Sequence, residues 1–218
     1  ASVPFPPIDV SAEPGDGSIF VSWSGPSSDG GSPILNYTLY RSTNGGGWDP
    51  VITKGADDRS YLDLDIMAGY IYAYRVVAMN VLGSSEFSSP SNEVVARYQL
   101  NIGIDTDSAS TNLGVIVKMY GKATYSEHLL PVASVSLSLA YSTNSGQTWM
   151  ELPSAVTDSA GNYEISWIPP ATGVYTVRVS WAGDNMFFAA ESFLSLAIDS
   201  SVADSVLSVQ SNSQISNF

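Results

Sequence analysis

The chain has 218 residues and a formal net charge of −13, from 8 basic and 21 acidic residues. This excess of acidic groups repels phosphate backbones and anionic lipid surfaces, which argues against nucleic-acid binding and electrostatic membrane docking. The absence of cysteine excludes disulfide bonds and thiolate zinc sites. Apolar residues make up 44% of the chain, enough for a packed core, and charged residues only 13%, about half the usual share.

The sequence gives no sign of membrane insertion. It contains no apolar run near the roughly 18 residues that mark a membrane span, and no signal peptide is recognisable. The start at Ala1-Ser-Val-Pro4 suits either a mature end after signal cleavage or a trimmed fragment. We expect an extracellular or cell-surface location.

Turn-forming residues interrupt the first half every 8–12 residues or so, as in all-β domains. The pattern predicts strands at Ile8–Val10, Ile19–Trp23, Ile34–Arg41, Trp48–Thr53 and Ser88–Ala96. Between the last two lies a strand, a tight corner at Gly69 and a second strand.

Strict alternation in the strand after Gly69 places Tyr72, Tyr74, Val76 and Ala78 on one face. A tyrosine just after such a corner packs its ring below and bonds the upstream backbone through its hydroxyl. The stretch therefore predicts a β-sandwich.

The first half resembles the fibronectin type III family over about residues 5–97. The residues that carry the resemblance are Pro14-Gly-Asp-Gly17, Val21 with Trp23, Ser28-Asp-Gly-Gly-Ser-Pro-Ile34, Tyr37 with Tyr40-Arg-Ser42, Tyr72-Ala-Tyr-Arg-Val-Val-Ala-Met-Asn80 and Ser89-Pro-Ser-Asn-Glu-Val94. The resemblance implies seven strands in two sheets, with Trp23 in the core. The adhesive Arg-Gly-Asp tripeptide of some members is absent.

The second half predicts further strands at residues 100–104, Leu113–Tyr125, Val132–Tyr141, Tyr163–Trp167, Val174–Trp181 and Phe193–Ile198. It resembles a bacterial or archaeal immunoglobulin-like surface repeat over about residues 99–198. The residues that carry this are Pro131-Val-Ala-Ser-Val135, Tyr141-Ser-Thr-Asn-Ser-Gly-Gln-Thr-Trp149, Thr157-Asp-Ser-Ala-Gly-Asn-Tyr163, Gly173-Val-Tyr-Thr-Val177 and Trp181-Ala-Gly-Asp-Asn-Met-Phe-Phe188. The resemblance implies a second sandwich of prokaryotic origin.

Together these patterns predict an all-β chain of two tandem immunoglobulin-like β-sandwich domains, at residues 1–97 and 98–198. The linker around Arg97-Tyr98-Gln99 is short and lacks Gly and Pro, which favours a semi-rigid rod. Residues 199–218 form a tail that is either the start of a further domain or an exchangeable strand.

No residue set predicts catalysis. The only histidine, His128, lies in a loop beside a glutamate, and a lone imidazole of this kind is usually a surface residue. The acidic residues sit singly in turns, where aspartate is favoured for local backbone bonding. We expect no enzyme activity and no cofactor. Asp105 and Asp107 are candidate calcium ligands, expected near the junction between the domains.

Three further residues are candidates for binding or modification. Trp48 and Trp149 could stack on sugars if their rings are exposed, although a core or interdomain role is the alternative. Trp149 also ends a stretch, Ser142–Trp149, that is similar to the Asp-box hairpin, with Asn144 in place of aspartate. Asn36 opens an Asn-Tyr-Thr glycosylation acceptor.

Three functions fit these observations. The first is a non-enzymatic structural or adhesion module pair of a prokaryotic cell-surface, surface-layer or filament protein, whose partners are other extracellular domains or subunits. The second is a carbohydrate-binding accessory region of a secreted glycoside hydrolase, with a polysaccharide partner. The third is a filament subunit that exchanges its tail strand with a neighbour.

Overall fold

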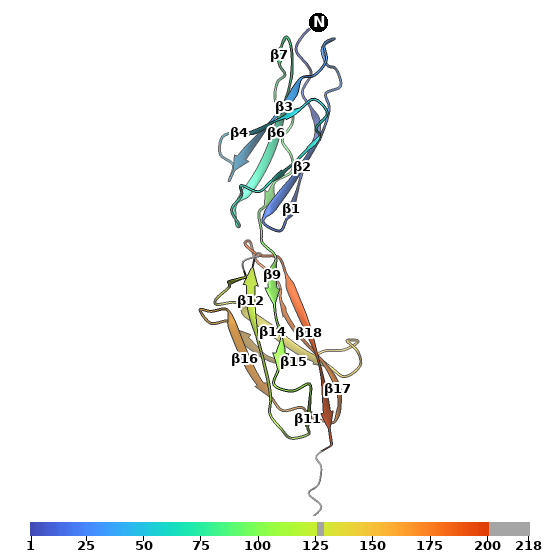
Figure 1. Ribbon diagram of the computed structural model, residues 1–218, viewed down its shortest axis with the longest axis vertical. Coiled ribbons are helices and arrows are strands. Elements are labelled where there is room, and N and C mark those ends of the chain that lie inside the picture. The colour runs from blue at the N-terminus through green and yellow to red at the C-terminus, as the bar shows by residue number, and fades with distance from the viewer. Residues whose placement is uncertain (126–128, 201–218) are drawn as a thin grey trace, which may run out of the picture.

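The computed structural model describes residues 1–125 and 129–200, and these residues form strands and no helix. Two β-sandwiches follow one another end to end along the long axis of the molecule (Figure 1). The first sandwich contains β1–β8 and the second contains β9–β18. The predicted all-β fold of tandem sandwiches is confirmed.

Two sheets build the first sandwich, with strand orders β1-β2-β5 and β4-β3-β6-β7, and β8 also pairs with β6. The strands are β1 (Ile8–Gly15), β2 (Ser18–Ser24), β3 (Asn36–Thr43), β4 (Asp49–Gly55), β5 (Ser60–Asp63), β6 (Ile71–Asn80), β7 (Gly83–Ser84) and β8 (Val94–Val95).

Two five-stranded sheets build the second sandwich. In one, β12 (Val117–Tyr125) pairs with β9 (Leu100–Ile102), β10 (Asp105–Thr106), β13 (Leu130–Pro131) and β16 (Asn162–Trp167). The other has the order β11 (Ser110–Asn112), β18 (Ala190–Asp199), β17 (Gly173–Trp181), β14 (Ser136–Ser142) and β15 (Met150–Val156).

Each sandwich encloses its own apolar core. The alternation predicted for β6 is confirmed, because Tyr72, Tyr74, Val76 and Ala78 are all buried. Trp23 is buried in the same core, as the family resemblance implies. The alternating positions Val135, Leu137 and Leu139 lie in the second core.

The corner predicted at Gly69 is also present. Gly69 has a φ of +84°, a conformation that glycine adopts without steric cost. The Met67 N–H donates to the Tyr72 hydroxyl at 2.9 Å, and Tyr72 is 3% exposed. The second sandwich has an equivalent corner that the sequence analysis missed, where the buried Tyr175 hydroxyl donates to the Ala171 carbonyl at 2.8 Å.

A buried carboxylate joins the two sheets of the first sandwich. Asp63 is fully buried, and its Oδ2 accepts hydrogen bonds from the Tyr74 hydroxyl and from Arg41 Nη1, both at 2.9 Å. Arg41 also contacts Asp65, whose side chain is 95% exposed. The Asp63 carboxylate is thus paired and hydrogen-bonded, as a buried charge must be.

The predicted extent of the last strand of the first half, Ser88–Ala96, is wrong. Regular strand pairing there is limited to Val94–Val95. Before it, three serines spaced three residues apart face every second residue of β6. Each serine N–H donates to a β6 carbonyl, and the serine hydroxyl accepts from the N–H of that same β6 residue. The pairs are Ser85 with Ala78, Ser88 with Val76 and Ser91 with Tyr74. Serine hydroxyls therefore replace backbone carbonyls along this edge.

Two further differences concern the second half. The strand predicted at Leu113–Tyr125 begins only at Val117, since Gly114 turns the chain with a φ of +89°. Strand β15 was not predicted, because Pro153 and the strand's largely exposed side chains leave no apolar alternation. The part of the tail from residue 201 onward, in which an exchangeable strand is predicted, lies outside the described residues.

We predict that Asp63→Ala lowers the free energy of unfolding of the first sandwich by about 3–5 kcal/mol, because it leaves the Arg41 guanidinium without its buried partner. Urea unfolding followed by tryptophan fluorescence measures this loss. The matched control is Asp65→Ala, which removes only the exposed partner of Arg41 and should leave the midpoint almost unchanged. Equal shifts of the urea midpoint in the two variants would contradict the role of Asp63 as the buried partner of Arg41.

Stability should also fall in alkali. Burial raises the pKa of the Tyr37, Tyr74 and Tyr163 hydroxyls, and Asp63 raises that of Tyr74 further. The folded chain therefore holds protons that the unfolded chain releases above about pH 10, and stability is lost as pH rises beyond that point. Thermal unfolding between pH 8 and about pH 12 tests this, and Tyr163→Phe should make the decline less steep. An unchanged slope in that variant would count against the buried hydroxyl as its cause.

Candidate functional site

The linker between the sandwiches is bonded to both of them. Ala96 N–H donates to the Tyr70 carbonyl, and the Arg97 carbonyl accepts from Gly17 N–H, both at 2.9 Å. One residue later, Tyr98 N–H donates to the Met186 carbonyl of the second sandwich at 2.9 Å, and the Tyr98 carbonyl accepts from Phe188 N–H at 3.0 Å. The chain thus passes from one sandwich to the other with no unbonded residue between them.

Side chains fill this junction, which we define as Asp16, Gly17, Gly69, Arg97, Tyr98 and Met186–Phe188. The Tyr98 ring lies so close to Gly17 that a Cβ there would be 2.7 Å from Tyr98 Cε1. The Tyr125 ring lies 5.3 Å from those of Tyr98 and Phe187. The Asp16 carboxylate accepts from Gln99 N–H at 2.7 Å. These contacts oppose bending between the sandwiches.

A second feature repeats in both sandwiches: an arginine stacked on a tryptophan on the outer face of a sheet. In the first stack, Arg75 of β6 lies 4.5 Å from the Trp48 ring centroid and 5.8 Å from that of Phe87. In the second, Arg178 of β17 lies 4.5 Å from the Trp149 ring centroid, and the Trp149 and Phe193 rings are 6.2 Å apart. The two candidate sugar-stacking residues therefore occupy corresponding positions and are each half-buried against an arginine.

Similar hairpins bring the two tryptophans into place. Trp48 follows the β3–β4 turn and Trp149 follows the β14–β15 turn. A Ser-Thr-Asn sequence opens both turns, at residues 42–44 and 142–144. In the second turn, Asn144 Oδ1 accepts from Thr148 N–H at 3.0 Å. The repeated Ser-Thr-Asn, followed by tryptophan, is the signal in the sequence that marks the two stacks.

The arginines of the two stacks form no ion pair among the described residues, a property that they share with Arg97. Their Nε atoms are buried without a hydrogen-bond partner among the described residues. None of the salt bridges found in that part of the chain includes Arg75 or Arg178. Arg41, by contrast, is bound to two carboxylates.

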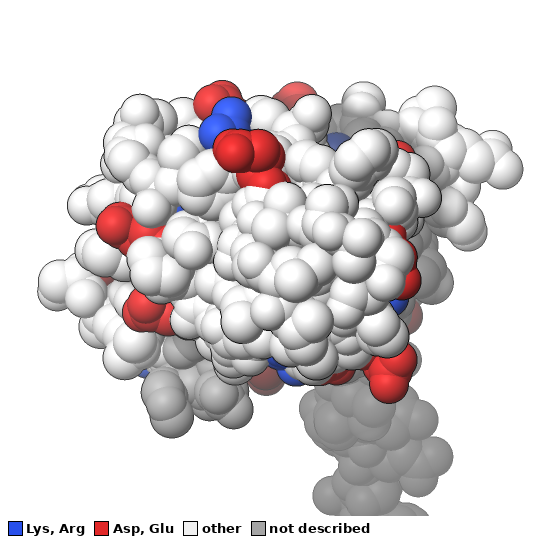
Figure 2. All heavy atoms as spheres, turned by 90° about the horizontal axis from the view of Figure 1, so that it is seen from above, with Lys and Arg blue, Asp and Glu red and all other residues white. Residues whose placement is uncertain are grey.

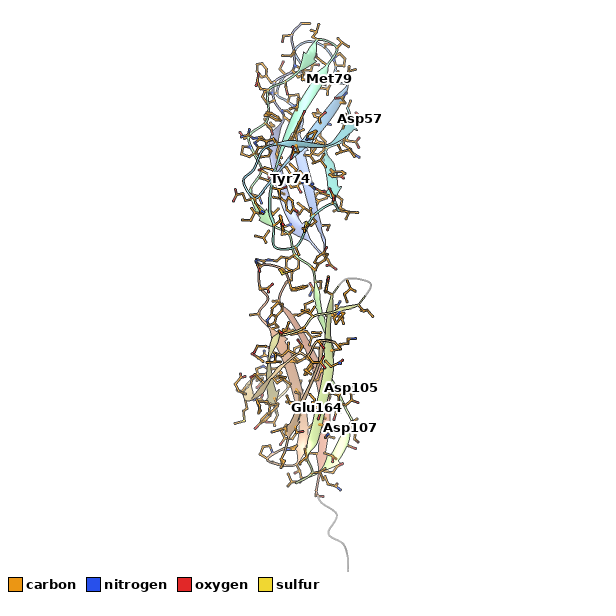
Figure 3. The ribbon with its side chains drawn as sticks, turned by 90° about the vertical axis from the view of Figure 1, so that its left-hand side faces the viewer. Asp57, Tyr74, Met79, Asp105, Asp107 and Glu164 are labelled. Carbon is orange, nitrogen blue, oxygen red and sulfur yellow. The ribbon has the colours of Figure 1, made fainter. Side chains whose placement is uncertain are left out.

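Asp105 and Asp107 do not lie at the junction, where we expected them. Figure 3 places both along the second sandwich, away from the first, and Asp105 pairs with Tyr120 of β12. Both are exposed. Among the described residues, no three carboxylates or histidines come together in a group that could hold a metal ion. The expected position is therefore wrong.

Asn36 is the first residue of β3, where its backbone faces Gly55 of β4 and Met79 of β6. It is half-buried, and its side-chain amide contacts the Met79 sulfur at 4.0 Å. The acceptor is therefore in a central strand rather than in a loop. His128 lies outside the described residues.

One hollow near acidic side chains has a volume of about 410 Å³ and is lined by Tyr120, Asp158, Asn162 and Glu164 among others. Asp158 binds the backbone N–H groups of Ala160 and Asn162 at 2.8 Å, and the bond from Asn162 is the main cause that lowers its pKa. Glu164 pairs with Lys118 at 3.3 Å. These carboxylates are engaged in a turn and in an ion pair, which favours a structural role.

Comparison with known proteins finds a family match over the first sandwich. The family model of the fibronectin type III domain matches residues 5–94. This match supports the resemblance deduced for the first half, and domains of this kind are typically non-catalytic. No helix in the described part of the chain is long and apolar enough to cross a membrane.

Several proteins share part of the sequence or the fold. The chain is 31% identical over 115 residues to an amylopullulanase of Thermoanaerobacter thermohydrosulfuricus, covering 53% of this chain and 7% of that protein. It is 36% identical over 88 residues to human contactin-2, covering 38% of this chain and 8% of that protein. The structure of a chicken interferon gamma receptor alpha chain aligns with a TM-score of 0.56 at 12% identity, over 88% of this chain and 98% of the other. That likeness concerns the fold alone.

Proposed function

We propose that the chain is a rigid two-domain spacer of a prokaryotic extracellular or cell-surface protein. The observation that carries this proposal is the junction, where Arg97 and Tyr98 are hydrogen-bonded to opposite sandwiches without a free residue between them. A linker bonded in this way restricts the angle between domains, whereas a free linker would let them rotate independently. The domains in this proposal are residues 1–97 and 98–198.

The similarity to modules of much larger proteins supports a structural or accessory role. The extracellular location is supported by the small share of charged residues, 13% of the chain. The prokaryotic origin rests on the resemblance of the second half to surface repeats. Partners in this role are neighbouring domains of the same protein or other extracellular subunits.

A second candidate is an accessory region of a secreted carbohydrate-active enzyme. The observation that favours it is the identity with an amylopullulanase over 115 residues, a longer stretch than the 90 residues matched by the fibronectin type III family model. The coding sequence on either side of this chain decides the question. A catalytic domain in the same polypeptide supports this candidate, and repeated sandwich domains or a surface anchor support the spacer.

The spacer predicts a single, narrow distribution of distances between the two sandwiches. Because the chain has no cysteine, Ser89→Cys and Ser154→Cys place one spin label on each sandwich, and pulsed electron paramagnetic resonance measures the distances. Inserting Gly-Ser-Gly between Arg97 and Tyr98 should broaden the distribution, since it frees the linker from one set of bonds.

The control is the same three-residue insertion between the exposed Val81 and Leu82, which follow the end of β6 opposite the junction. The distribution should stay narrow in that variant. A distribution that is already broad in the unmodified chain would overturn the spacer proposal. Retention of a narrow distribution after the linker insertion would show that the backbone bonds do not set the angle.

A further inference from the structure

We propose that the two tryptophan–arginine stacks are binding sites for neutral polysaccharide, one on each sandwich. The stacks have the same construction although they come from sandwiches with different sequences. Each arginine sits on a central strand of its sheet, since β6 pairs with β3 and β8, and β17 pairs with β14 and β18. Each tryptophan comes from the hairpin that follows the neighbouring strand, β3 or β14.

The guanidinium groups supply hydrogen-bond donors that the protein itself leaves unused. Within the described ranges neither Arg75 nor Arg178 has a carboxylate partner. Their Nε atoms are buried, so the donors left for a ligand are the terminal Nη groups. A guanidinium presents several N–H groups in a fixed plane, which suits two adjacent oxygen acceptors. Stacking on the indole holds that plane in place, so little conformational freedom is lost when a ligand binds.

Aromatic rings beside each arginine supply the apolar part of the site. Phe87 is 40% exposed and Phe193 is 52% exposed, and each lies next to its stack. Tyr40 extends the first group, with its ring 4.9 Å from that of Phe87. A pyranose ring has apolar C–H faces and a rim of hydroxyl groups. Exposed rings next to free N–H donors match both features.

The charge of the chain selects neutral polymers among the possible ligands. With 21 acidic and 8 basic residues, the chain repels polyanions at long range. Figure 2 shows acidic side chains spread over the N-terminal end, with few basic ones among them. A peptide strand added to a sheet needs an unpaired edge, and both arginines lie on strands that are already paired on both sides.

Two binding sites on one chain hold a polymer more strongly than either site alone. A polysaccharide offers many equivalent sugar units, so the second site binds at a high effective concentration once the first is occupied. We therefore expect weak binding by each stack and stronger retention by the pair. Loss of one stack should weaken retention several-fold, and loss of both should reduce it by about tenfold or more.

Native gel electrophoresis tests the proposal, because the strongly acidic chain migrates well without detergent. Gels contain soluble starch, hydroxyethylcellulose or glycol chitin, and retardation is measured against polymer concentration. We expect retardation of the unmodified chain by at least one of these polymers, and progressively less in Trp48→Ala, Trp149→Ala and the double variant. Arg75→Gln with Arg178→Gln removes the donors while keeping the rings, and should also reduce retardation.

The control variant is Phe20→Ala, which removes an aromatic ring of similar exposure, 44%, from the other sheet of the first sandwich. It should be retarded like the unmodified chain. Thermal unfolding of every variant separates lost binding from lost folding. If a tryptophan variant does not fold, the arginine variants test binding in its place. The proposal is overturned if no neutral polymer retards the chain, if only an anionic polymer such as alginate does so, or if folded stack variants bind normally. None of these results bears on the distance distribution that tests the spacer.

Discussion

The constraint on which the structure depends is the hydrogen bonding of the short linker. Ala96 is bonded beside the Gly69 corner, while Tyr98, two residues later, is bonded to Met186 and Phe188 of the second sandwich. A Cβ at Gly69 would itself lie 3.5 Å from the Met186 side chain. The corner that Tyr72 closes is therefore also the surface on which the second sandwich rests. Stability of the first core and the angle between the sandwiches share the same few residues.

Features that depend on neighbouring residues were the ones that could be predicted from the sequence. The alternation of β6 and the Tyr72 corner were confirmed, because a strand facing a core needs an apolar residue at every second position and the corner is closed within five residues. The buried position of Trp23 followed from the family resemblance in the same way. These elements lie in segments whose local preference and tertiary position agree.

Features that join distant residues could not be predicted in this way. The serine-bonded edge repeats every three residues against a strand of period two, so no strand pattern reveals it. Arg75 and Trp48 are 27 residues apart in the chain, and Arg178 and Trp149 are 29 apart, so only the pairing of β3 with β6 and of β14 with β17 brings them together. Asp105 and Asp107 were expected beside the linker because they are close to it in the sequence. They lie instead along the second sandwich, away from the linker (Figure 3).

The two stacks share their geometry, but the turns that lead to them differ in length and in hydrogen bonding. In the first hairpin the Ser42 hydroxyl donates to the Gly46 carbonyl at 2.9 Å, whereas in the second the Ser142 hydroxyl accepts from Gly146 N–H at 2.9 Å. Trp48 comes four residues after Asn44, and Trp149 comes five residues after Asn144. Both turns nevertheless bring an indole to 4.5 Å from an arginine. Covering the outer face of a sheet does not require a tryptophan placed over an arginine, because any apolar side chain can do so. The shared geometry instead points to the half-buried pairing of ring and guanidinium as the feature that both hairpins produce.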